Sequence, residues 1–249
     1  MVNRQFVLAS RPVGMPRESD FRMIETSLPS AGEGELLLRA RYLSVDPYMR
    51  GRMSAARSYA PPVELGGLMV GGAVCEVLES KHPDFQPGDI VTGFTGWQEY
   101  AVLPARDVCK VDLALAPVST ALGILGLTGL TAYFGIRDVC AVKPGETVVV
   151  SGAAGAVGST AGQIAKIAGC RVVGVAGGPA KVEYVTGECG FDAALDYKAI
   201  SDYALALRML CPKGIDAYFD NVGGSVSDAV FTLLNPRAHR HLRSDFALH

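Results

Sequence analysis

The sequence predicts an α/β fold in two successive parts: a β-rich, barrel-like part, and then a doubly wound parallel sheet. Short apolar runs separated by Pro/Gly turns fill residues 1–120, a pattern typical of a barrel-like β domain. Strand-like and helix-like segments alternate over residues 121–237, as in doubly wound sheets. The composition is 49% hydrophobic and 19% charged, which is that of a globular chain.

The elements of the first part are short. Residues 35–40 and 71–78 are mostly apolar runs and are expected to form strands. Residues 85–91 form a turn that leads into a strand, because Pro87 fixes φ and Gly88 tolerates a positive φ.

The second part alternates helices and strands. Residues 122–139 are apolar with helical spacing, although the glycines at 123, 126 and 129 weaken this helix. Residues 147–151 form a continuous apolar run, which is typical of a strand buried on both faces. Beyond it the pattern predicts helices at about 156–168, 180–189 and 201–211, and strands at 171–176, 193–196 and 216–220.

The composition also excludes several kinds of partner. A formal net charge of -2 offers no attraction to nucleic acid or to an anionic membrane. No apolar stretch is long enough to span a bilayer. The six cysteines are scattered singly and the first residues contain no apolar leader, so we expect reduced thiols and a cytoplasmic protein.

The strongest motif is a glycine turn, GAAGAVG at 152–158. A pyrophosphate must approach backbone N–H groups at a helix N-terminus, where any Cβ in the way would push it off. Gly155 and Gly158 are spaced to allow that approach. Because the turn follows a buried strand and opens a helix, it predicts a dinucleotide site. The alternative is a tight strand-to-helix turn without a nucleotide.

The end of the next strand indicates which dinucleotide is bound. NAD-binding units carry an acid about 20 residues past the glycines, and this acid binds the ribose 2′-OH. Here Gly177 and Gly178 hold that place, and Lys181 follows shortly. The missing acid and the nearby cation favour the 2′-phosphate of NADPH. Lys181 is equally compatible with a solvated lysine in the first turn of a helix.

Two further residues are candidates by position. Asn221 follows the strand at 216–220, and the carboxyl ends of strands line the cofactor site in doubly wound sheets. An asparagine before two glycines is equally explained by turn formation. Tyr48 offers a hydroxyl for a substrate pocket, but such a tyrosine is more often half-buried packing.

No metal centre is predicted. Zinc dehydrogenases need Cys, His or Glu ligands at close positions, whereas His82 is the only histidine before the final stretch. The other three, His239, His241 and His249, lie in that stretch, where nothing would preorganise a site.

Five motifs occur in order along the chain. They are VDPYMRGRM at 45–53, GGLMVGG at 66–72, GLTGLTAY at 126–133, AAGAVGSTAGQIAK at 153–166 and YFDNVGG at 218–224. Together they resemble the zinc-free medium-chain reductases of the prostaglandin reductase and leukotriene B4 dehydrogenase group, and most of all its bacterial curcumin reductase branch. The resemblance runs from residue 4 to residue 237.

The resemblance implies a GroES-like β domain at 1–120 and a Rossmann domain at 121–237, with NADPH bound between them. The implied activity is reduction of the C=C bond of α,β-unsaturated ketones and aldehydes. Hydride would reach the β-carbon, hydroxyl donors would stabilise the enolate, and the α-carbon would then be protonated. The implied partners are a small-molecule enone or enal and, in a homodimer, a second copy of the chain.

The resemblance also assigns roles to residues. The family's cofactor-binding positions are matched by Gly155, Ala156, Val157, Gly158, Lys181, Tyr197 and Asn221. The first four form the pyrophosphate turn, the next two contact the 2′-phosphate, and the last lies near the nicotinamide. Tyr48 matches a substrate-pocket position and is the catalytic candidate.

The chain departs from the family at its end. A six-strand Rossmann sheet needs two more βα units of roughly 30 residues each, whereas residues 238–249 show no periodic apolar pattern. We expect this tail to lie outside the fold, as after a changed reading frame, and to leave the strand at 216–220 as an exposed edge. The region it replaces resembles the one that supplies nicotinamide contacts, a substrate-loop tyrosine and much of the dimer edge, which counts against a homodimer.

Two functions are compatible with this sequence. One is an NADPH-dependent ene-reductase. The other is a truncated, catalytically silent remnant that at most binds nucleotide. NADPH-dependent loss of an enone chromophore would distinguish them, and equally tight binding of NADH would contradict our interpretation of Gly177, Gly178 and Lys181.

Overall fold

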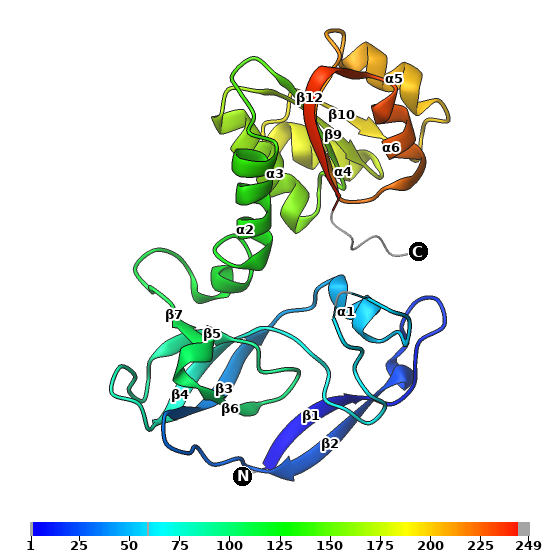
Figure 1. The fold of residues 1–249 in the computed structure, drawn as a ribbon. Helices are drawn as coiled ribbons and strands as arrows, with labels where there is room; N and C mark the ends of the chain where they lie inside the picture. The colour runs from blue at the N-terminus through cyan, green and yellow to red at the C-terminus, as the bar shows by residue number, and fades with distance from the viewer. Residues whose placement is uncertain (1, 59, 244–249) are drawn as a thin grey trace. The chain divides into compact units, whose positions relative to one another are not determined.

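A computed structural model describes residues 2–58 and 60–243, with side chains through residue 236 and at residue 238. The chain forms two compact units, Met1–Leu122 and Gly123–His249 (Figure 1). Each unit is described by itself.

The first unit contains a β-hairpin and a five-stranded antiparallel sheet (Figure 1). The hairpin pairs β1 (Val2–Leu8) with β2 (Phe21–Ser27). The sheet has the order β6-β3-β4-β5-β7, with β3 (Glu35–Leu43), β4 (Ala73–Ser80), β5 (Ile90–Gly93), β6 (Tyr100–Pro104) and β7 (Val108–Lys110). Register shifts between β3 and β4 bend the sheet.

Local sequence explains how this sheet is assembled. Gly88 has φ +91 and β5 begins at Ile90, so the turn predicted at 85–91 is confirmed. Buried side chains such as Leu36, Leu38 and Val91 form the core beneath the sheet. The unit also contains α1 (Tyr48–Arg52) and the 3₁₀ turns Glu18–Asp20, Ala105–Asp107 and Val118–Leu122.

The second unit is a parallel sheet with helices packed around it (Figure 1). The sheet has five strands in the order β10-β9-β8-β11-β12. Its strands are β8 (Thr147–Ser151), β9 (Arg171–Ala176), β10 (Ala193–Asp196), β11 (Ile215–Asp220) and β12 (Leu234–Arg243). Its helices are α2 (Leu127–Phe134), α3 (Ala156–Ile167), α4 (Pro179–Glu183), α5 (Tyr203–Leu210) and α6 (Gly224–Phe231). This strand order confirms the doubly wound fold. None of the described helices is long and apolar enough to cross a membrane.

Helices cover both faces of this parallel sheet. All five residues of β8 are buried. Val148 and Val150 belong to one core cluster, which includes residues of α2 and α3, and Val149 belongs to a second cluster, which includes residues of α5 and α6. The continuous apolar run in the sequence therefore corresponds to a strand buried on both sides, as predicted.

The helix predicted over 122–139 is shorter than the apolar pattern suggested. It begins at Leu127 with Gly126 as its N-cap and continues into a π-helical turn, Gly135–Val139. A Cβ on Gly129 would lie 1.8 Å from the Ile124 carbonyl oxygen, so the chain before the helix folds back against it. Helix α4 continues in the same way, into the π-helical turn Tyr184–Glu188.

Two expectations about the end of the chain are wrong. Residues 234–243 form β12, which pairs in parallel with β11, so β11 is not an exposed edge and the tail predicted from residue 238 is part of the sheet up to residue 243. An added parallel strand needs backbone hydrogen bonds rather than an apolar period, which is why the pattern missed it. The Asn235 amide anchors its start by donating to Asp216 Oδ1 at 2.8 Å. His249 lies outside the described residues, as do the side chains of His239 and His241.

Candidate cofactor site

The glycine turn joins the end of β8 to α3 through close backbone packing. Gly152 has φ +58, and Gly155 is the N-cap of α3, with no side chain capping the helix. A Cβ on Gly158 would lie 2.3 Å from the Gly152 carbonyl oxygen, and one on Gly155 would lie 3.2 Å from it. Only glycine allows this approach at position 158.

The first turn of α3 therefore presents backbone N–H groups without an obstructing side chain at the cap. The N–H groups of Ala156, Val157 and Gly158 have no acceptor within the helix. Together with the positive end of the helix dipole they suit an anion. Helix α3 has 12 residues, so its dipole is well developed. The turn fits a pyrophosphate, and its residues lie where the sequence placed them.

Asn221 lies beside this turn, at the end of β11. Its backbone N–H donates to Ser151 Oγ and its Nδ2 donates to the Ser151 carbonyl oxygen, both at 2.8 Å. A Cβ on Gly152 would lie 3.2 Å from the Asn221 Cβ. The structure thus brings Asn221 and the glycine turn together. We call the turns after β8 and β11 the inner half of the carboxyl edge.

The buried carboxylate of Asp220, which was not predicted from the sequence, holds part of the inner half by hydrogen bonds. Asp220, 1% exposed, ends β11. It accepts hydrogen bonds of 2.7 to 3.0 Å from Ser151, Tyr218, Val222, Gly223 and Ser227. The two backbone donors hold the turn that contains Asn221. Because burial disfavours the phenolate, the pKa of Tyr218 is raised, and the phenol remains a hydrogen-bond donor.

The turns after β9 and β10 form the outer half of the carboxyl edge. Gly177 and Gly178 follow β9, and Tyr197 follows β10. A Cβ on Gly177 would lie 2.6 Å from Cε1 of Tyr197, so the tyrosine ring packs against the glycine backbone. Lys181 lies exposed in the first turn of α4. The predicted 2′-phosphate residues therefore lie on neighbouring turns.

Tyr48, the catalytic candidate, lies in the first unit. It is the first residue of α1, and its partly buried side chain packs against a cluster that includes Leu8, Met49 and Met69. Half-buried packing of this kind is the alternative that the sequence allowed for Tyr48. Its role in a substrate pocket stays a prediction.

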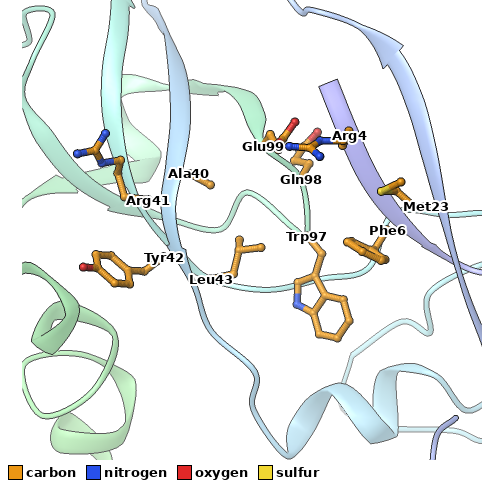
Figure 2. Close-up of a pocket in the computed structure, with 10 residues that line it drawn as sticks. All are labelled: Arg4, Phe6, Met23, Ala40, Arg41, Tyr42, Leu43, Trp97, Gln98 and Glu99. Carbon is orange, nitrogen blue, oxygen red and sulfur yellow. Dashed lines mark hydrogen bonds and ion pairs between the residues drawn. The ribbon is translucent and has the colours of Figure 1, made fainter. Parts of the chain in front are cut away.

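The first unit also carries a groove of about 420 Å³ (Figure 2). Phe6, Met23 and Leu43 contribute apolar surface, and an ion pair between Arg4 and Glu99 borders it. The indole nitrogen of Trp97 is buried and has no hydrogen-bond partner among the described residues. None of the predicted site residues lines this groove.

Within the described residues no group of three or more His, Cys, Asp or Glu side chains is arranged to hold a metal ion. The six cysteines are free thiols, and all but Cys109 are buried. Burial raises the pKa of Cys75 to about 12 and that of Cys140 to about 11, which makes these thiols poor nucleophiles at neutral pH.

Known proteins resemble the chain over both units. Residues 4–111 match a family described as the N-terminal domain of oxidoreductase, and residues 156–242 match one described as zinc-binding dehydrogenase. The chain is 53% identical to an NADPH-dependent curcumin reductase of Escherichia coli, covering 95% of this chain and 68% of that protein. It is 44% identical to an NADP(+)-dependent 2-alkenal reductase of Nicotiana tabacum, covering 92% and 68%.

A solved structure shows the same fold. The crystal structure of CurA from Vibrio vulnificus in complex with NADPH has a TM-score of 0.89 and is 49% identical, covering 94% of this chain and 69% of that one. The two family matches and these relatives agree. The chain belongs to the zinc-independent medium-chain dehydrogenase/reductase family, in the group that includes the curcumin, 2-alkenal and prostaglandin reductases.

Proposed function

We propose that this chain reduces the C=C bond of α,β-unsaturated ketones and aldehydes with NADPH. The observation that carries the proposal is the inner half of the carboxyl edge, where Gly155 and Gly158 leave the first turn of α3 open beside Asn221. The 53% identity to an NADPH-dependent curcumin reductase extends over 95% of the chain and supports the same activity. The named relatives are reductases, which favours turnover over a silent remnant.

Different residues along the carboxyl edge would contact the pyrophosphate, the 2′-phosphate and the nicotinamide of NADPH. The backbone N–H groups of Ala156, Val157 and Gly158 would hold the pyrophosphate, and Gly155, without a side chain, would let it approach. Lys181 and Tyr197 would contact the 2′-phosphate, since no acid occupies the end of β9 to accept from a ribose hydroxyl. The Nδ2 of Asn221 donates to the Ser151 carbonyl oxygen, and its Oδ1 would accept from and orient the nicotinamide amide.

When bound, NADPH supplies the hydride that the substrate's β-carbon receives. The protein's own part is to orient the enone and to stabilise negative charge on its carbonyl oxygen. Tyr48 is the proposed hydroxyl donor to that oxygen, because it matches the family's substrate-pocket position.

We also propose a cytoplasmic location, whereas the homodimer that the family resemblance implies stays an open prediction. The six free cysteines support a reducing compartment. Light scattering of the purified chain at several concentrations would establish its oligomeric state.

The decisive experiment follows the fluorescence of NADPH while the chain is mixed with a 2-alkenal or a conjugated dienone. We expect fluorescence loss that depends on both enone and enzyme, with a saturated product and slower turnover with NADH. The saturated ketone serves as a control that should give no oxidation. NADPH binding without turnover would instead support the silent remnant.

A further inference from the structure

The two turns of the outer half start side by side. Gly177 and Gly178 follow β9, and Tyr197 and Lys198 follow β10. The two strands are parallel neighbours, and their last residues, Ala176 and Asp196, pair with each other. A shift of the backbone at Asp196 would therefore move the start of both turns.

One carboxylate oxygen joins the two turns. Oδ1 of Asp196 accepts the backbone N–H of Gly178 at 2.8 Å and the backbone N–H of Lys198 at 3.0 Å. Because both donors belong to the main chain, these bonds hold the course of the chain in each turn. The charge of the acceptor strengthens both.

Gly178 is the residue that most needs such a restraint. Its φ is +96, in a region that glycine enters and leaves freely. It is also the N-cap of α4, and no side chain caps that helix. The bond to Asp196 therefore determines where α4 begins, and with it the position of Lys181 in the first turn.

Tyr197 is located by the same arrangement. Its N–H donates to the Ala176 carbonyl oxygen at 3.1 Å, and its own carbonyl oxygen accepts the Tyr203 hydroxyl at 3.2 Å. Its ring occupies the space that a side chain at residue 177 would need. Asp196 fixes the backbone on both sides of this contact, at Gly178 and at Lys198.

We propose that Asp196 is a positioning residue that gives the chain its preference for a 2′-phosphate. This inference rests on the proposed function, in which Lys181 and Tyr197 contact that phosphate. Asp196 anchors the backbone that carries both side chains. Among the described residues, Asp196 forms hydrogen bonds with the turns after β9 and β10 and none with the glycine turn after β8, which is held by its own backbone packing. Asp196 therefore affects discrimination between nucleotides with and without a 2′-phosphate. It does not affect binding of the parts that the two kinds of nucleotide have in common.

A carboxylate near this site has a second conceivable role, which predicts the opposite effect. An acid that faced the ribose would accept from a 2′-OH and repel a 2′-phosphate. Positioning needs only the acceptor oxygen, whereas repulsion needs the charge. Asp196→Asn retains an acceptor and removes the charge, while Asp196→Ala removes both, so the two variants separate the roles.

The test is calorimetric titration of the full chain with 2′,5′-ADP and with 5′-AMP, which differ only in the 2′-phosphate. We expect Asp196→Ala to weaken 2′,5′-ADP binding about tenfold and to leave 5′-AMP binding unchanged, since about 1.4 kcal/mol corresponds to a factor of ten. Asp196→Asn should stay within about twofold of the wild type for both ligands. Lys181→Ala, which removes a phosphate contact directly, is the positive control.

Three results would overturn the proposal. They are equal losses for both ligands in Asp196→Ala, tighter 2′,5′-ADP binding in Asp196→Asn, and a wild-type chain that binds the two ligands equally well. None of these measurements involves enone turnover. A chain that discriminates between the ligands but reduces no enone would contradict the proposed function and keep this inference, whereas a reductase without discrimination would do the reverse.

Discussion

At the end of β8 the backbone packs closely against itself. A Cβ added on Gly158 would lie 2.3 Å from the Gly152 carbonyl oxygen. At the end of β9 the nearest atoms to a Cβ added on Gly177 belong to the side chain of Tyr197, and a Cβ on Gly178 would meet nothing within 4 Å. The inner half is therefore maintained by close backbone packing together with the hydrogen bonds that the buried Asp220 accepts. The outer half is maintained by a few hydrogen bonds to main-chain groups, such as those to Asp196.

The difference explains why the two halves suit different tasks. A pyrophosphate is common to NADH and NADPH, so the surface that binds it can be rigid. The 2′-phosphate is the feature that distinguishes them, and an exposed lysine and a half-exposed tyrosine suit it. We expect substitutions in the inner half to affect stability and all nucleotide binding, and those in the outer half to affect preference.

The largest effect is expected at Asp220. Asp220→Ala would leave the buried hydroxyls of Ser151 and Ser227, and two partly buried backbone N–H groups, without their acceptor. We expect a loss of at least about 3 kcal/mol in the free energy of unfolding, measured by urea denaturation. Asp220→Asn, which keeps one acceptor oxygen, should lose less. A loss below about 1 kcal/mol for the alanine variant would show that the hydrogen bonds of Asp220 do not maintain the inner half.

A smaller but more specific effect is expected at Gly158. In Gly158→Ala the new methyl group must displace the Gly152 backbone, at a cost of about 1–3 kcal/mol. Binding of 5′-AMP and of 2′,5′-ADP should weaken in parallel, because the pyrophosphate turn is distorted for both. The matched control is Gly187→Ala, where an added Cβ has nothing within 4 Å. Unchanged nucleotide binding in Gly158→Ala would show that the close approach of residue 158 to the Gly152 backbone is not needed for the site.

The smallest effect concerns an ion pair that joins the end of α3 to the start of β9. Asp192 accepts from Lys166 of α3 at 2.8 Å and from the Val172 N–H of β9 at 2.7 Å. Burial by itself would raise the pKa of this carboxyl, but Lys166 and the Val172 N–H hold it below its usual value. The stabilisation is therefore present above the unfolded-state pKa of about 4 and is lost as the pH falls through the lower folded-state pKa.

The measurement is the free energy of unfolding of the wild type and Asp192→Asn as a function of pH. We expect a difference of at most about 1 kcal/mol at neutral pH, because the pair is partly exposed. The difference should shrink in acid, below about pH 4. A difference that grew on acidification would contradict the assigned direction of the pKa shift.

Much of the second unit follows from local pattern. The strand at 147–151, the glycine turn and the helix after it are where the sequence predicts them, because a two-sided buried strand and a phosphate-type turn leave signals within a few residues. The extra strand β12 left no such signal, since edge pairing depends on backbone groups that every residue has. For Asp220 the sequence carried a weak signal, because an acid that ends an apolar strand must find hydrogen-bond donors.

Chain-local chemistry was enough to indicate a doubly wound sheet, a glycine turn and a site without an acid after β9. Three-dimensional contact decided the rest. Ser151 and Asp220 are separated by 69 residues and still share a hydrogen bond, and Gly178 and Asp196 are separated by 18. A sequence pattern reports the preferences of neighbours along the chain, whereas these bonds depend on the order in which the strands lie side by side. That order placed Asn221 against Ser151 and tied both outer turns to Asp196.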